Sequence, residues 1–448
     1  MGLGFTDNFI TDIELLLSVG SLVCLFLYLV IRRPIAGLIC FLFLVITRAN
    51  EYIPQLRVFR PSIGVGIIML AGLLFFLLAN RQPVYFTGPQ SLILFVFIAF
   101  CWSTLFMTDP APRDRPIVFF FEPLLLISVS FFATINTVRS MTDLRKVLLI
   151  LGFTGLAISL LTIVQSFFTG IMSGASYAYE SEADLYTRAA TAGLGPNGVA
   201  FTLVTILPFF FYFVDNEERS ILVKRLCIVG IPLAVLTIFL TFSRGGFICL
   251  IIAFLLILRR RLNLKYFMGV VVLFLMIAIL VPGAFWERVL GTATVDPTGQ
   301  GRALIWQGAL KMIHAHPLTG VGYGQFVNEL TRYQPYSGPA GPHNTFLGIA
   351  AETGLINLFI FVSLLFVTFY DLRQLQRNAL VFSDTRLAGL SETLKTSLVV
   401  AVIFGLTGDQ RHTVIFYVCI ALVVALKRIW RQSQPTIAAD VPKLQEVE

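Results

Sequence analysis

The residues whose types and spacing best fit chemistry are His343 and Asn344, with Gly354 after nine intervening residues. Pro342 precedes them, and an apolar helix is predicted directly after them. Asn344 is a good N-cap, so His343 would stand at the N-terminus of that helix, sharing a face with Gly354. The helix dipole favours the neutral imidazole there, which can accept a proton as a general base. A histidine that only caps the helix, with a glycine that only permits close packing, is the alternative.

Arg244 lies in Ser243-Arg244-Gly245-Gly246, the polar interruption of an otherwise apolar stretch from 226 to 258. At about 1.5 Å per residue, this stretch is too long for one crossing of a hydrocarbon core of about 30 Å. We therefore predict two helices that fold back at this turn. A guanidinium beside glycines suits a diphosphate, because its fork binds phosphate oxygens in pairs. An arginine that snorkels to the membrane interface is the alternative.

Two further arginines are candidates for binding an anion. Arg188 lies in a long segment just before an apolar run, where a second phosphate contact or a loop ion pair with Glu182 or Asp184 would explain it. Arg302 begins a predicted amphipathic helix over 302–314 and could reach a phosphate or a sugar, or could simply lie on the helix face. The pattern leaves both pairs of alternatives open.

Composition restricts the class of protein that must position these residues. The hydrophobic fraction is 57% and the charged fraction only 13%, whereas soluble domains carry about a quarter charged residues. Apolar runs near the spanning length of about 20 residues recur along the whole chain. They predict an all-α polytopic membrane protein with about 12–14 transmembrane helices. The net charge of +8 fits topogenic bias and attraction to the inner leaflet, and we find no basic patch that suggests nucleic acid.

Orientation follows from the tendency of Lys and Arg to remain on the cytoplasmic side. Most of the 33 basic residues fall inside when the long segment 284–343 is placed outside. The predicted organisation is N-terminal transmembrane helices over 1–170, transmembrane helices with an outer loop over 171–283, a periplasmic helical loop over 284–343, C-terminal transmembrane helices over 344–430 and a polar cytoplasmic tail over 431–448.

Other polar residues receive structural interpretations. The amphipathic helix is expected to lie on the outer membrane surface, and the glycine-rich run from Gly320 to Gly324 is expected to form a tight turn. Glu352 is an ionisable residue within an apolar span and is expected to pair elsewhere for a structural purpose. His314 and His316 would diverge on a helix, so we expect no metal site.

Together, these motifs resemble the O-antigen ligase-like family, which includes O-antigen ligases, polysaccharide polymerases and protein O-oligosaccharyltransferases. The matching residues are His343-Asn344 with Gly354, Gly301-Arg302 with Trp306 and His316-Pro317-Leu318-Thr319-Gly320-Val321-Gly322, Ser243-Arg244-Gly245-Gly246, and Arg188 with Gly195-Pro196-Asn197. The resemblance implies a C-type glycosyltransferase-like architecture and an inverting reaction without a metal or cofactor. It assigns the base to His343 and the donor diphosphate to Arg188 and Arg244, with Arg302, Asn344, Gly354 and Asn197 in support.

The resemblance also implies the partners and the location. The donor would be a glycan on undecaprenyl diphosphate, and the acceptor a glycan or a lipid A core; membrane lipids would surround the protein. The site would face the periplasm from a bacterial inner membrane, in lipopolysaccharide or exopolysaccharide biosynthesis. A transporter or flippase of lipid-linked saccharides is the alternative, and it would favour broken helices and ionisable residues near the middle of the membrane.

Overall fold

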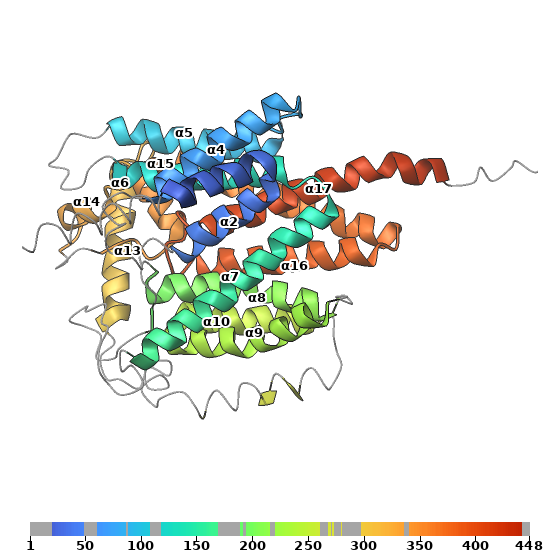
Figure 1. Ribbon diagram of the computed structural model, residues 1–448. Helices are drawn as coiled ribbons and strands as arrows, with labels where there is room; N and C mark the ends of the chain where they lie inside the picture. The colour runs from blue at the N-terminus through green and yellow to red at the C-terminus, as the bar shows by residue number, and fades with distance from the viewer. Residues whose placement is uncertain are drawn as a thin grey trace, which may run out of the picture.

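The structure, a computed structural model, shows one helical bundle (Figure 1). It describes residues 20–48, 61–86, 88–107, 118–168, 189–190, 194–215, 220–259, 268–269, 271–272, 279, 297–335 and 340–440. The regular elements in these ranges are α-helices. The predicted all-α polytopic class is therefore confirmed.

The helices vary in length, and not all of them are long enough to cross a bilayer. By length and composition, six helices in the described ranges could cross a membrane, and five shorter apolar helices accompany them, including Gly20–Arg32. One of the apolar runs that predict these helices, 265–283, falls almost wholly outside the described residues. In chain order, the labelled helices are α2 (Pro34–Thr47), α4 (Pro61–Ala79), α5 (Pro89–Met107), α6 (Val118–Thr137), α7 (Met141–Phe168), α8 (Pro196–Asp215), α9 (Ile221–Leu240), α10 (Arg244–Leu258), α13 (Pro297–Ala315), α14 (Phe326–Tyr333), α15 (Thr345–Val381), α16 (Thr385–Phe404) and α17 (Val414–Asp440).

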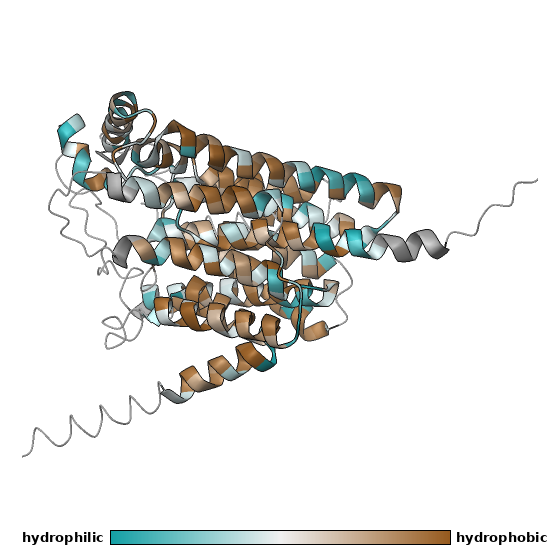
Figure 2. Ribbon diagram, turned by 90° about the horizontal axis from the view of Figure 1, so that it is seen from above, coloured by the Kyte–Doolittle hydropathy of each residue, from teal (hydrophilic) through white to brown (hydrophobic). Residues whose placement is uncertain are grey.

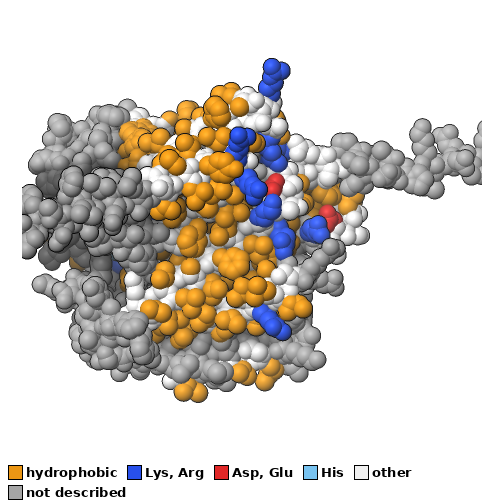
Figure 3. Space-filling model, viewed as in Figure 1, with side chains coloured by type: hydrophobic (Ala, Val, Ile, Leu, Met, Phe, Trp, Pro, Cys, Tyr) orange, Lys and Arg blue, Asp and Glu red, His pale blue; other side chains and the backbone are white. Residues whose placement is uncertain are grey.

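The two ends of the bundle differ. Helix α13 lies across one end of the bundle, where it crosses the direction of the long helices (Figure 1). Apolar residues dominate the middle of the bundle, and hydrophilic residues collect at its opposite end (Figure 2). On the face drawn in Figure 3, Lys and Arg side chains also gather at that opposite end. We call these the α13 end and the basic end.

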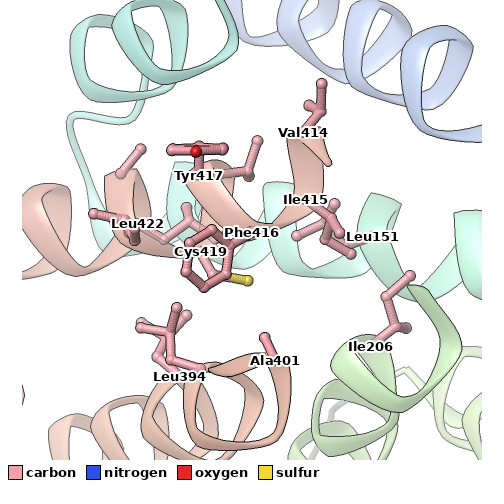
Figure 4. Close-up of a cluster of buried hydrophobic side chains, with 14 of the residues drawn as sticks. Leu151, Ile206, Leu394, Ala401, Val414, Ile415, Phe416, Tyr417, Cys419 and Leu422 are labelled. Carbon is pink, nitrogen blue, oxygen red and sulfur yellow. The ribbon is translucent and has the colours of Figure 1, made fainter. Parts of the chain in front are cut away.

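Helix α17 forms the centre of the bundle. Its residues from Ile415 to Leu426 are almost all fully buried, as expected for a helix that is apolar all round. Figure 4 shows Phe416 and Cys419 of α17 among side chains from α7, α8 and α16. The helix continues to Asp440, beyond residue 430, where the polar tail was predicted to begin.

Helix α15 is broken at Gly354. This glycine has φ 81° and ψ 170°, a conformation that is essentially restricted to glycine. The Leu355 amide donates to the Pro317 carbonyl at 2.8 Å, and the Ala351 carbonyl accepts from the Val321 amide at 2.8 Å. Helix α15 is therefore not continuous through Gly354, because the backbone of the 317–322 segment inserts where a helix would bond to itself.

Helices α13 and α14 pack through a second, smaller core, which we call the α13 cluster. The predicted helix over 302–314 and its apolar face are confirmed. However, Ile305, Ala309 and Met312 are buried against protein and not against the membrane surface, so the predicted partner of this face is wrong. The buried residues of the α13 cluster are Ile305, Ala309, Met312, Val321, Phe326, Leu330 and Ala351.

Candidate active site

His343 lies at the N-terminus of α15, as predicted. The Asn344 side chain accepts hydrogen bonds from the amides of Phe346 and Leu347 at 2.9 and 3.0 Å, which confirms the N-cap. His343 itself is half-buried and has φ 47°. A non-glycine residue in this left-handed region is uncommon and persists where its surroundings fix it.

The surroundings of His343 include the connection between α16 and α17, residues 405–413, which we call the 405–413 loop. The Thr345 amide donates to the Gly405 carbonyl at 2.7 Å, and Asn344 Nδ2 donates to the Leu406 carbonyl at 3.1 Å. The Thr345 hydroxyl also takes part: it donates to the carbonyl of Gly408 and accepts from the amide of Gln410. The start of α15 is thus joined to this loop by main-chain and side-chain bonds.

Arg244 begins α10 at a turn with α9, as predicted from the length of the apolar stretch. Ser243 caps the helix by accepting from the Gly246 amide at 3.2 Å. The same hydroxyl donates to Asn197 Oδ1 at 2.9 Å, which joins the turn to the start of α8. Asn197, predicted as a supporting residue, therefore contacts the serine beside Arg244.

The 405–413 loop also contacts the Arg244 turn. A Cβ atom on Gly245 would overlap the Thr407 hydroxyl, so the two residues are in direct contact. Thr407 follows Leu406, which binds Asn344, and consecutive Cα atoms are about 3.8 Å apart. The neighbours of Arg244 and of His343 therefore bind adjacent residues of one loop at the α13 end.

Two other predicted arginines relate to this region. Arg188 lies outside the described residues, but the amide of its neighbour Ala189 donates to the Leu240 carbonyl at 3.0 Å, at the end of α9. Arg302 is half-buried on α13 and precedes Trp306 by four residues, so both lie on one helix face.

A buried ion cluster that sequence reasoning largely missed lies beside these residues. Arg411 Nη1 lies 2.9 Å from Glu352 Oε2, and Arg411 Nε lies 3.1 Å from Asp409 Oδ2. The Glu352 and Arg411 side chains are only 2% and 7% exposed. Glu352 also accepts from the amides of Gly324 and Phe326. The predicted structural pairing of Glu352 is thereby confirmed, and its partner is named.

A short polar run in the sequence could have indicated Asp409 and Arg411, the other members of this ion cluster. Asp409-Gln410-Arg411-His412 separates two apolar runs, and such a run at a membrane boundary is a candidate for function. His412 Nε2 and the Tyr323 hydroxyl lie 2.8 Å apart. Burial and the neighbouring Arg411 and Arg48 hold the pKa of His412 well below its usual range, so this imidazole is neutral at pH 7.

Replacing Glu352 with glutamine is expected to lower the free energy of unfolding by about 3 kcal/mol, because the buried Arg411 guanidinium loses a carboxylate. The matched control is Glu329→Gln in α14, whose partner Arg332 is 64% exposed; it should cost less than about 1 kcal/mol. Denaturant unfolding of the purified protein in detergent measures both. Equal small shifts in the two variants would contradict the assignment of a buried ion pair.

Asp409 should make stability depend on pH. Burial raises the pKa of this carboxyl to about 6 from 3.8, against the opposing effect of Arg411. The folded state therefore holds the proton more tightly, so the stability contributed by Asp409 is present below about pH 4 and is lost as pH rises through about 6. Thermal unfolding of Asp409→Asn and the native protein across this window should show the native protein losing stability relative to the variant. A difference that does not vary with pH would refute the expectation.

The contacts above define a multi-spanning helical membrane protein with a polar site at one end of its bundle, built on the N-termini of α10 and α15 and on the 405–413 loop. Residues 229–362 match the family model described as O-Antigen ligase. This part of the chain is therefore similar to the O-antigen ligase family, as the motifs indicated, and it contains Arg244, Arg302, His343 and Gly354. The search of curated proteins found no match.

Proposed function

We propose that this protein transfers a glycan from an undecaprenyl-diphosphate donor to an acceptor hydroxyl at the periplasmic face, with inversion and without a metal. His343 accepts the proton of the acceptor hydroxyl as its oxygen attacks the anomeric carbon. The bond between that carbon and the diphosphate oxygen breaks, and the diphosphate leaves with the electron pair. The acceptor is a glycan or a lipid A core.

The observation that carries this proposal is the shared contact with the 405–413 loop. Leu406 binds Asn344, next to the proposed base, while Thr407 contacts Gly245, next to the proposed diphosphate ligand. A base and a cation on separate helices are thus held at one end of the bundle by adjacent residues. Transfer of a glycosyl group needs this combination, because the base acts on the nucleophile while the cation acts on the leaving group.

The other arginines add support. Negative charge develops on the diphosphate as it leaves, and preorganised guanidinium groups stabilise that charge. Arg188 is joined to Ala189, which is bonded to α9 four residues before Arg244. Arg302 shares a helix face with Trp306, whose indole contacts the residue before His343. These connections favour a common anion site for the three arginines.

Charge distribution supports a periplasmic site. The Lys and Arg side chains visible in Figure 3 gather at the basic end, and cytoplasmic loops carry the excess of such residues. The α13 end, with His343 and Arg244, then faces the periplasm.

The broken helix α15 does not favour a transporter. Transporter helices break to line a substrate cavity near the middle of the membrane. Here the 317–322 segment occupies the break at Gly354 and bonds to the backbone on both sides of it. Glu352 beside the break is paired with Arg411. The break is therefore filled by another segment of the chain, which is not the arrangement expected of a transporter.

The test is transfer by the purified full-length protein of a saccharide from polyprenyl diphosphate to candidate acceptors, in the presence of EDTA. Arg244→Ala should lower kcat/KM by about 10²- to 10³-fold, the cost of losing one preorganised donor to a developing anion. The control is Arg259→Ala, at the opposite end of the same helix, where Arg259 pairs with Glu392. Native activity in Arg244→Ala, or a requirement for a metal, would defeat the proposal.

A further inference from the structure

We infer that Trp306 is a positioning residue for His343, an inference that rests on the proposed function. Trp306 Nε1 donates a hydrogen bond to the Pro342 carbonyl at 3.1 Å, across 36 residues of sequence. The indole does not belong to the proposed set of base and cations. Its hydrogen bond nevertheless acts on the peptide group that immediately precedes the base.

The orientation of that peptide group determines where the histidine backbone points. The Pro342 carbonyl belongs to the planar peptide unit between residues 342 and 343, so fixing this oxygen restricts rotation about the N–Cα bond of His343. That rotation is the φ angle, and it has the left-handed value of 47°. A backbone in this region persists only when its neighbours hold it, and Trp306 supplies a hydrogen bond that does so.

Other contacts also hold the backbone before and after His343. After His343, Asn344 and Thr345 are bonded to the 405–413 loop. Before it, Pro342 is buried and packs so close to Gly348 that a Cβ there would lie 2.8 Å from the proline ring. The backbone is therefore held by contacts on both sides of His343. The indole hydrogen bond is one of the contacts before it.

Helix α13, which carries Trp306, is held in place against α15. Ile305, Ala309 and Met312 bury one face of α13 in the α13 cluster. The chain that follows α13 is bonded into the break of α15 at Gly354. Helix α13 is thus connected to α15 through this backbone pairing and to the residue before His343 through the Trp306–Pro342 hydrogen bond, so the indole can hold the Pro342 peptide group in a constant position.

Loss of the indole hydrogen bond should therefore affect the chemical step more than donor binding. Trp306→Phe keeps an aromatic ring and removes the N–H group. We expect kcat to fall by about 10- to 100-fold, because small displacements of a catalytic group are costly. We expect KM for the polyprenyl-diphosphate donor to change by less than about threefold, because the arginines are untouched.

The matched control is Tyr333→Phe. Tyr333 and Trp306 both pack against the α13 cluster, and the Tyr333 hydroxyl bonds His316 Nε2 at 2.9 Å. This variant also removes one hydrogen-bonding group at the α13 end, but at a site away from Pro342, and should keep native kcat. A second replacement of Trp306, by 3-benzothienylalanine, keeps the size of the ring and lacks the N–H group, so it tests the bond even where phenylalanine disturbs packing.

The assay separates failure of this inference from failure of the proposed function. Native transfer that His343→Ala abolishes, with native kcat in both Trp306 variants, overturns the role of Trp306 alone. Equal losses in Tyr333→Phe and the Trp306 variants would show a merely structural effect and also overturn it. Transfer that is absent, or that His343→Ala leaves intact, refutes the proposed function and this inference with it.

Discussion

Replacing His343 with alanine is expected to lower kcat for glycan transfer by about 10²- to 10⁴-fold, the usual contribution of a positioned general base. Binding of the polyprenyl-diphosphate donor should change little, because the proposed diphosphate ligands lie on other segments of the chain. Single-turnover transfer and equilibrium binding of donor, measured on the same purified protein, check the two halves of this result.

The size of the expected loss follows from how His343 is held. Its backbone is left-handed, and both flanking residues are hydrogen-bonded to other parts of the chain. A structure that restrains one residue in this way is expected to benefit from its side chain, since backbone strain clusters at functional sites. Alanine removes the imidazole and leaves these flanking contacts available.

The matched control for this variant is His314→Ala. His314 is exposed in the last turn of α13, at the same end of the bundle, and has no proposed role in transfer. It should retain native turnover. A general base contributes at least about 100-fold to the rate. If His343→Ala lowered kcat by less than about tenfold, the assignment of His343 as the base would therefore be wrong.

Replacing Gly354 with alanine is expected to have the largest effect on folding. The left-handed extended backbone of Gly354 costs about 1–3 kcal/mol for other residues. A Cβ there would also overlap the Leu318 carbonyl, and overpacking costs about 1–3 kcal/mol more. The variant can relieve the backbone strain and the steric overlap only if the hydrogen bonds between the 317–322 segment and α15 break.

This result would distinguish a glycine that only permits close packing from one whose backbone conformation the break in α15 requires. Gly341→Ala is the matched control, because Gly341 lies shortly before α15 and a Cβ atom there would have no neighbour within 4 Å. Gly320→Ala should resemble Gly354→Ala, since its Cβ would overlap the Glu352 backbone across the same contact. Thermal unfolding and the folded yield in detergent measure all three variants. Equal stability of Gly354→Ala and Gly341→Ala would contradict the proposed backbone pairing.

Gly354 should affect transfer as well. The backbone pairing that it permits connects α13 to α15, and Trp306 of α13 contacts the residue before His343. Any folded fraction of Gly354→Ala is therefore expected to show a lower kcat than the Gly341→Ala control. The glycine of the His-Asn motif would then act through the support of the histidine and not through contact with the substrate.

Several elements were predictable because their causes are local. The α9–α10 turn followed from a stretch too long for one span with a single polar interruption, and Ser243 caps α10 at that place. The N-cap at Asn344 follows from the preference of its own side chain for neighbouring amides. Helix α13 and its buried face followed from apolar periodicity.

Other features were missed or wrong because they depend on distant parts of the chain. The break at Gly354 has no local cause that distinguishes it from a packing glycine, because the bonds that compensate for it come from the 317–322 segment. The apolar face of α13 was assigned to the membrane, because periodicity indicates that a face is buried and not what buries it. Arg411 was overlooked because its carboxylate Glu352 lies 59 residues earlier.

The amino-acid sequence by itself determined that this is a helical membrane protein, where several of its helices begin, and which polar residues interrupt its apolar runs. These properties depend on composition, on periodicity and on bonds between near neighbours. Only the tertiary structure decided that the Arg244 turn and the His343 segment contact adjacent residues of the 405–413 loop, and that Trp306 holds Pro342. Such contacts arise from the packing of whole helices against one another, so no spacing within a single segment encodes them.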